Sequence, residues 1–196
     1  MNYLAHIYLS FGDPKVTLGN FIADVVRGKD YLEYPEEVQH GLLLHREIDT
    51  YTDSHPIPRR SSKLLHNRYH HYSMVIVDIY YDHFLAKLWE EYSEVPLLEY
   101  TTDFYGLLRE NLHWMPQPIQ RMSHYMMQDN WLYNYSQFDG LQRVFQGMNR
   151  RTKLKSGMDT AVEDLEMYYS DFEADFRTFF EDLVIFSREK LVHLKS

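Results

Sequence analysis

Residues 42–53 read LLLHREIDTYTD, and residues 74–85 read MVIVDIYYDHFL. Both stretches have the apolar content of a buried helix, yet each carries a histidine and two or more acidic residues. Burying an ionised carboxylate among apolar side chains costs free energy unless the carboxylate is paired or binds a cation. Two such stretches in a chain of 196 residues therefore indicate that these acids serve a chemical function.

The rest of the chain predicts an all-α protein. Only 8 Gly and 7 Pro interrupt it, and its apolar residues recur at helical spacing. The predicted helices cover residues 15–31, 36–53, 58–71, 73–93, 97–113, 117–135, 137–149 and 158–193. The β-branched residues at 74–79 are also compatible with a strand, although the helical spacing of the residues after them favours a helix. The length and the hydrophobic fraction of 44% predict one globular domain over residues 1–196.

Composition excludes several classes of protein. No apolar run approaches the ~18 residues of a membrane-spanning helix, and the first residues lack the basic segment of a signal peptide. The chain has no Cys, which excludes disulfides and thiolate metal ligands and is typical of the cytoplasm. A net charge of −9 argues against nucleic-acid binding by bulk electrostatics. We therefore expect a cytoplasmic protein that binds neither nucleic acid nor membrane; its oligomeric state stays open.

Two stretches contain basic residues and no acidic residue, although the chain as a whole is acidic. Residues 54–77 contain Arg59, Arg60, Lys63 and Arg68, and residues 140–158 contain Arg143, Arg150, Arg151, Lys153 and Lys155. A local basic surface on an acidic protein attracts acidic ligands. The alternative is that these residues only solvate exposed helix faces.

Helical spacing places the polar residues of the two opening stretches on inward faces. His45 and Asp49 are four residues apart and share the stripe of the apolar residues, and Gly41 allows another backbone to approach this helix. Asp78 and Asp82 have the same spacing on the later helix. Two carboxylates one turn apart repel each other unless a cation, a proton or an arginine lies between them.

Further polar residues extend this set. Asn20 and Asp24 are again four residues apart, and His6 lies near the start of the chain. Aspartates and histidines on neighbouring helices are typical ligands of Mn²⁺, Fe²⁺ or Mg²⁺. Each residue also has a simpler interpretation: Asp24 pairing with Arg27, Asp49 with Arg46, Asp82 with Arg59 or Arg60, and His45 bonded to a carbonyl in the core. His83 points about 100° away from Asp82 around the helix.

No rival catalytic motif occurs. The chain has no Gly-x-Ser-x-Gly elbow, no glycine-rich phosphate loop and no His-Glu-x-x-His sequence. A thiol nucleophile is excluded because there is no Cys. Metal-assisted hydrolysis is the chemistry that remains.

Several segments together resemble the acyl carrier protein phosphodiesterase family. They are MNYLAH (1–6), GNFIAD (19–24) with RG (27–28), LHR (44–46) with Asp49 and TD (52–53), and Asp78 with DHFL (82–85) and Trp89. NWL (130–132) and GM (147–148) are weaker matches. The resemblance implies an all-α bundle of about seven to eight helices, related to the HD phosphohydrolases. The chain departs from those enzymes in having no His-Asp dipeptide, only the reversed pair at 82–83.

The same resemblance implies an activity and a set of site residues. The activity is Mn²⁺-dependent hydrolysis of the phosphodiester that joins 4′-phosphopantetheine to a serine of holo-acyl carrier protein. We expect Asp24, His45, Asp49 and Asp78 as metal ligands. Proton transfer or support of the ligands is expected from Asp82, His83 and His6, and phosphate binding from Arg46 or Arg27. Because acyl carrier proteins are acidic, Arg59, Arg60, Lys63 and Arg68 are the expected docking residues.

Two other functions are compatible with the sequence. One is a metal-dependent phosphohydrolase that acts on a nucleotide or another small phosphoester. The other is a non-catalytic helical module that binds an acidic partner.

Overall fold

The computed structural model describes residues 1–196 and confirms the all-α class, because it contains helices and no strand. The α-helices are α1 (Tyr3–Tyr8), α2 (Pro14–Ile22), α3 (Glu36–Ser54), α4 (Pro56–Tyr69), α5 (Ser73–Lys87), α6 (Leu97–Asn111), α7 (Gln117–Gln128), α8 (Trp131–Asn134), α9 (Phe138–Arg151), α10 (Ala161–Met167) and α11 (Tyr169–Leu194). Short 3₁₀ turns connect several of them. None of the helices has the length and apolar character needed to cross a membrane.

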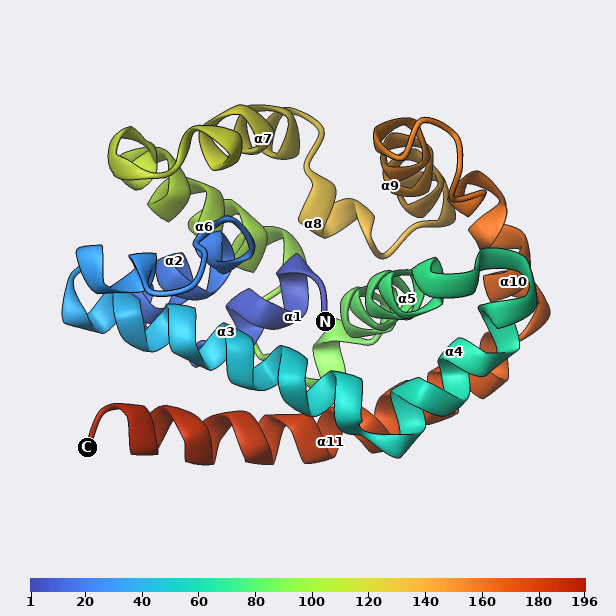
Figure 1. Cartoon of the computed structure of the whole chain (residues 1–196), viewed down its shortest axis with the longest axis horizontal. Helices are drawn as coiled ribbons and strands as arrows, with labels where there is room; N and C mark the ends of the chain where they lie inside the picture. Colours follow the sequence, from blue (N-terminus) through green and yellow to red (C-terminus); the bar gives the residue numbers. More distant parts are fainter.

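The short helix α1 lies near the centre of the molecule, where it contacts α2 and α5 (Figure 1). The long helix α11 runs along one side and packs against α3, α4 and α5. Helices α3 and α9 lie on different sides of the N-terminus. The central position of α1 gives its side chains access to both α3 and α5.

Helices α2 and α3 make the most extensive packing contact of the fold because two glycines let their backbones touch. A Cβ on Gly41 would lie 2.1 Å from the Val16 carbonyl oxygen, and a Cβ on Gly19 would lie 2.1 Å from the Val38 carbonyl oxygen. Gly41 therefore has the role expected from the sequence. The close crossing also brings Asn20, next to Gly19, against α3.

The core is one cluster of 46 buried residues and is rich in aromatic side chains. Helix α11 contributes Phe172, Phe176, Phe179 and Phe180, which are fully buried. Tyr80 and Tyr81 of α5 pack on these rings with centroid separations of 5.0 to 5.8 Å. This aromatic contact fixes α5, which carries Asp78 and Asp82, against α11.

The segment predicted as a helix over 15–31 is shorter in the structure. Helix α2 ends at Ile22 and is followed by 3₁₀ turns. Val26 adopts an extended conformation, and Gly28 has a φ of 49°, a left-handed value that interrupts a helix. Asp24 consequently lies in a 3₁₀ turn, not within a long helix.

Three other differences raise the number of helices above the seven to eight expected. The prediction for 117–135 missed a break at Asn130, which has a left-handed φ of 45°. The prediction for 158–193 missed the break between α10 and α11 at Tyr168. Helix α1 was not predicted, since it has only 6 residues and no capping side chain in its own sequence. The segment 74–79 is helical, as the spacing favoured.

Candidate functional site

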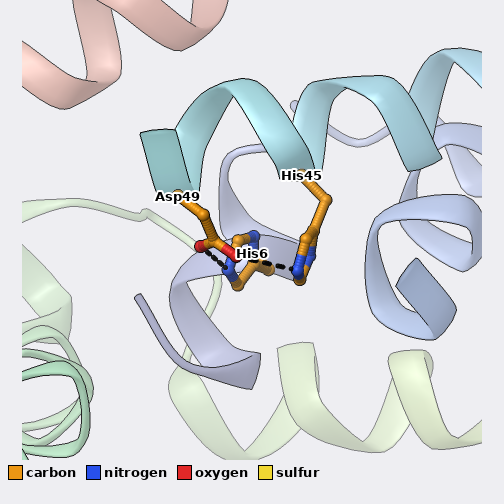
Figure 2. A group of neighbouring side chains, drawn as sticks. All are labelled: His6, His45 and Asp49. Carbon is orange, nitrogen blue, oxygen red and sulfur yellow. Dashed lines mark ion pairs between the residues drawn. The ribbon is translucent and has the colours of Figure 1, made fainter. Parts of the chain in front are cut away.

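Two histidines and an aspartate meet between α1 and α3 (Figure 2). The Nε2 atom of His6 lies 3.2 Å from Asp49 Oδ1, and the Nε2 atom of His45 lies 3.1 Å from Asp49 Oδ2. The two imidazole rings are stacked, with centroids 3.9 Å apart. The ligand-type atoms of the three residues all lie within 4.8 Å of one another.

Asn20 contacts the ring of His45 and the backbone of His6. His45 Nδ1 lies 2.9 Å from the Asn20 carbonyl oxygen, so the ring donates its Nδ1 proton there and turns Nε2 towards Asp49. The Asn20 side-chain amide donates to the His6 carbonyl oxygen over 2.7 Å. The simpler interpretation of His45 as a histidine bonded to a core carbonyl thus holds for one ring nitrogen only.

Asp24 and Asp78 adjoin this cluster in different ways. Asp24 Oδ1 lies 3.2 Å from His45 Nε2. Asp78 Oδ1 lies 3.1 Å from the amino nitrogen of Met1, which is itself 3.5 Å from Asp49 Oδ1. The structure therefore brings Asp24, His45 and Asp49 into direct contact, adds His6 to them, and links Asp78 through Met1.

The charges of the cluster are strongly coupled. Burial opposes a charge on His45, but the hydrogen-bonded carboxylates of Asp24 and Asp49 outweigh burial and raise its pKa to about 9. Burial, together with the neighbouring His45 charge, lowers the pKa of His6 to about 4. Burial alone would raise the pKa of Asp49, yet its close contacts with the rings of His45 and His6 lower it well below its usual range. The cluster therefore holds anionic carboxylates beside a neutral His6.

These residues fit a divalent cation. Metal ligands are deprotonated carboxylates and neutral imidazoles, so a cation bound here would displace the Nε2 proton that Asp24 and Asp49 hold on His45. A mixed set of carboxylates and imidazoles suits Mn²⁺ and Fe²⁺. Both ring nitrogens of His6 are buried without a hydrogen-bond partner, although Nε2 faces Asp49. A cation between His6, His45 and Asp49 satisfies this nitrogen and balances the carboxylates. Sequence reasoning had not placed His6 among the ligands, because residues at 6 and 45 share no helix.

Asp82 of α5 accepts hydrogen bonds from the first turn of α1. Its Oδ2 accepts a hydrogen bond from the Leu4 amide over 2.7 Å, and its Oδ1 accepts one from the Ala5 amide over 3.1 Å. Complete burial raises the pKa of Asp82 to about 7 despite these bonds. Asp82 thus caps α1 from another helix and positions His6; it pairs with neither Arg59 nor Arg60.

His83 faces away from the cluster. Its Nδ1 donates to the Tyr135 carbonyl oxygen over 2.8 Å, and its Nε2 accepts from the Tyr169 hydroxyl over 3.1 Å. It lines a separate cavity of about 450 Å³ with Lys87 and Glu166. Asp82 and His83 are adjacent in sequence but bond to different neighbours of α5.

His83 also makes stability depend on pH. Burial lowers its pKa to about 4, whereas an unfolded chain protonates histidine near pH 6.5. The unfolded state therefore binds more protons between these values, and stability falls as the pH drops from about 6.5 towards 4. His83→Asn removes this titration, so we expect the pH dependence of the unfolding free energy to weaken by up to about 1.4 kcal/mol per pH unit in that window. Urea denaturation at several pH values measures the slope, and an unchanged slope contradicts the expectation.

A cavity of about 640 Å³ opens beside the histidine–aspartate cluster. One wall carries Asp24, Asp49, Asp53 and Asp78. The facing helix α9 contributes Arg143, Arg150 and Arg151, and apolar side chains between them include Met74, Ile79, Trp131, Val144 and Met148. The cavity therefore joins an acidic wall to a basic one across an apolar lining.

The arginines and the lysine of 54–77 do not line this cavity. Arg60 forms an ion pair with Asp175 of α11, and Arg68 pairs with Glu163 and Asp164 of α10. The Arg59 guanidinium donates to the Asp53 carbonyl oxygen. Lys63 is exposed. The paired arginines fasten α4 to its neighbours, while the second acid-free stretch, 140–158, supplies the arginines at the cavity.

The two arginines expected at the phosphate also lie elsewhere. Arg46 donates to the Val26 carbonyl oxygen over 3.1 Å and lies 5.2 Å from the centre of the Tyr31 ring. Arg27 is exposed and does not pair with Asp24. Arg46 therefore holds the segment after α2 against α3, and neither arginine lines the cavity.

An all-α fold in which a histidine–aspartate cluster adjoins a cavity, with its aspartate on the cavity wall, is the arrangement of a helical hydrolase. The chain belongs to the acyl carrier protein phosphodiesterase family, whose model matches residues 1–183. Membership of this family makes it a phosphodiesterase.

Relatives with the same description cover nearly the whole chain. An acyl carrier protein phosphodiesterase of Photorhabdus laumondii is 31% identical over 92% of this chain and 91% of its own. One from Yersinia pestis is 30% identical over 98% of this chain and 100% of its own, and one from Escherichia coli is 30% identical over 92% and 94%. No solved structure matches the chain.

Proposed function

We propose that this protein hydrolyses the 4′-phosphopantetheine group from holo-acyl carrier protein and leaves the apo-protein. The observation that supports this most directly is the His6–His45–Asp49 cluster, whose Asp49 lines a cavity of about 640 Å³, in a chain of this family. The reaction adds water to phosphorus, breaks the bond from phosphorus to the serine oxygen, and returns a proton to that oxygen. Its products are 4′-phosphopantetheine and a free serine hydroxyl.

The proposed ligands of a divalent cation are His6, His45 and Asp49, with Asp24 beside them and Asp78 on the same cavity wall. This set extends the four ligands expected from the sequence by His6. When bound, such a cation supplies Lewis-acid catalysis and neutralises phosphate charge. Mn²⁺ is the proposed ion, and Fe²⁺ and Mg²⁺ are the alternatives that accept similar donors.

Two further residues position the proposed metal ligands. Asn20 sets the tautomer of His45 through its carbonyl oxygen, and Asp82 anchors the helix that carries His6. The volume of the cavity is within the roughly 300–1,000 Å³ of small-molecule sites, and its apolar lining suits the pantetheine arm. Fixed ligands of this kind reduce the reorganisation needed in the transition state.

The proposed function predicts a metal-dependent change in the mass of the carrier protein. Purified protein is incubated with holo-acyl carrier protein in Mn²⁺, Fe²⁺, Mg²⁺ or EDTA, and the product mass is recorded. We expect loss of the phosphopantetheine mass with the active cation and no loss in EDTA, because the cation that the carboxylates and imidazoles of the cluster would hold is the only proposed source of Lewis-acid catalysis.

Other outcomes distinguish the competing functions. An unchanged mass with every cation, for protein shown to be folded, contradicts the proposal. Hydrolysis of small phosphoesters under the same conditions then supports a small-molecule phosphohydrolase. Binding of apo-acyl carrier protein without any hydrolysis supports a non-catalytic module.

A further inference from the structure

We propose that the end of α9 and the turn after it form the docking surface for the acidic carrier protein, a proposal that rests on the proposed function. The surface consists of Arg143, Arg150, Arg151, Lys153 and Lys155, with Leu154 among them. We call it the α9 basic surface. It differs from the docking residues expected on α4.

The arginines of the α9 basic surface are free for a partner. Arg143, Arg150 and Arg151 line the cavity and are exposed, and none of them forms an ion pair within the chain, unlike Arg60 and Arg68 of α4. No acid occurs between residues 140 and 158. In a protein with a net charge of −9, such a surface is a local positive region that attracts an acidic protein.

Two residues of the turn after α9 have a strained backbone conformation. Lys153 and Leu154 have φ values of 56° and 62°, a left-handed region that costs non-glycine residues free energy and is enriched at functional sites. Leu154 is 70% exposed. An exposed leucine flanked by Lys153 and Lys155 offers an apolar contact inside a basic rim, which is the arrangement of many protein interfaces.

Hydrogen bonds behind the turn hold it in place. Ser156 Oγ donates to Asn149 Oδ1 over 3.0 Å, and Asn149 Nδ2 donates to Asp159 Oδ1 over 2.6 Å. Thr152 Oγ1 donates to Ser156 Oγ over 2.9 Å. Asn149 and Ser156 are buried, so the turn is supported from within and its basic side chains project outwards.

The α9 basic surface is next to the reacting groups. Its three arginines line the same cavity as Asp24 and Asp49 of the acidic wall. A carrier protein bound on the α9 basic surface lies at the mouth of the cavity, where its phosphopantetheine arm reaches the His6–His45–Asp49 cluster.

The test compares three pairs of substitutions that remove the same charge. Arg150→Gln with Arg151→Gln probes the α9 basic surface. Arg59→Gln with Lys63→Gln probes the rival surface on α4. Arg109→Gln with Arg121→Gln removes two exposed, unpaired charges that do not line the cavity and serves as the matched control. Circular dichroism melting checks that each variant is folded.

Each variant is assayed for KM and kcat with holo-acyl carrier protein and for binding of apo-acyl carrier protein by calorimetry, at low and high salt. We expect the α9 pair to raise KM and the apo-protein Kd at least about tenfold at low salt, less at high salt, with kcat changed less than about threefold. The control pair stays within about twofold. A rise in KM for the α4 pair alone, or no rise for the α9 pair, overturns the proposal.

The apo-protein binding separates this proposal from the proposed function. If the wild type binds apo-acyl carrier protein through the α9 basic surface but does not hydrolyse the holo-protein, the docking surface stands and the proposed function fails. If it hydrolyses the holo-protein and the α9 pair has no effect on KM or Kd, the proposed function stands and the docking surface is wrong. If it neither binds nor hydrolyses, both are wrong.

Discussion

Asp49→Asn is expected to abolish most of the hydrolysis of holo-acyl carrier protein and to weaken Mn²⁺ binding by at least about 100-fold. Loss of a residue that only supports a metal ligand costs up to about 100-fold in metal affinity, and loss of a proposed ligand should cost at least as much. The two Asp49 oxygens face the Nε2 atoms of His6 and His45 at 3.2 and 3.1 Å. Asparagine keeps the shape of the side chain but removes its negative charge and one acceptor oxygen. Steady-state kinetics and calorimetric titration with Mn²⁺ measure the two effects.

Glu47→Gln provides a control on the same helix. Glu47 forms an ion pair with Lys190 at 2.9 Å, and exposed pairs of this kind contribute about 0–1 kcal/mol. We expect its kinetics and metal affinity to stay within about twofold of the wild type. Full activity of Asp49→Asn would falsify the His6–His45–Asp49 site. It would favour Asp53 and Asp78, on the same cavity wall, as the metal ligands.

Gly41→Ala is expected to destabilise the protein by about 3 kcal/mol or more, which places it among the severe single substitutions. The new Cβ would lie 2.1 Å from the Val16 carbonyl oxygen and 2.7 Å from the Asn20 nitrogen. Both contacts are with backbone, so α2 and α3 have to move apart. Because Asn20 orients His45, any protein that still folds should also lose activity. Urea denaturation at constant pH measures the change.

Gly106→Ala separates this clash from the general effect of replacing glycine. Gly106 lies within α6, and a Cβ there meets nothing within 4 Å. Alanine in an unobstructed helix position stabilises by roughly 0.5–1 kcal/mol relative to glycine. The two substitutions are therefore expected to have opposite signs. Equal effects would show that the α2–α3 crossing tolerates separation.

Two features of α3 that the sequence predicts are present in the structure. The four-residue spacing of His45 and Asp49 predicted that they share an inward face, and their side chains meet in the structure. The presence of Gly41 on the same helix predicted close approach of another backbone, which is α2. Relations of this kind are local, because helical geometry alone sets which residues share a face.

Relations between helices could not be obtained in the same way. Asp82 was predicted to support the site, but its actual partners, the amides of Leu4 and Ala5, belong to a helix too short to be recognised. His83 follows Asp82 directly, yet it bonds to Tyr135 and Tyr169. A helical wheel shows that the two side chains diverge, but it does not show what each one meets.

The pattern of residues along the chain predicts the all-α class, the inward stripes of α3 and α5, and two acid-free basic stretches. That pattern does not predict that His6 joins His45 and Asp49, or that the arginines of α9 line the cavity while Arg60 pairs with α11 and Arg68 with α10. Periodicity acts within one helix, whereas these ion pairs and this ligand set form between helices. Which helices become neighbours depends on close backbone crossings and on the packing of the aromatic core.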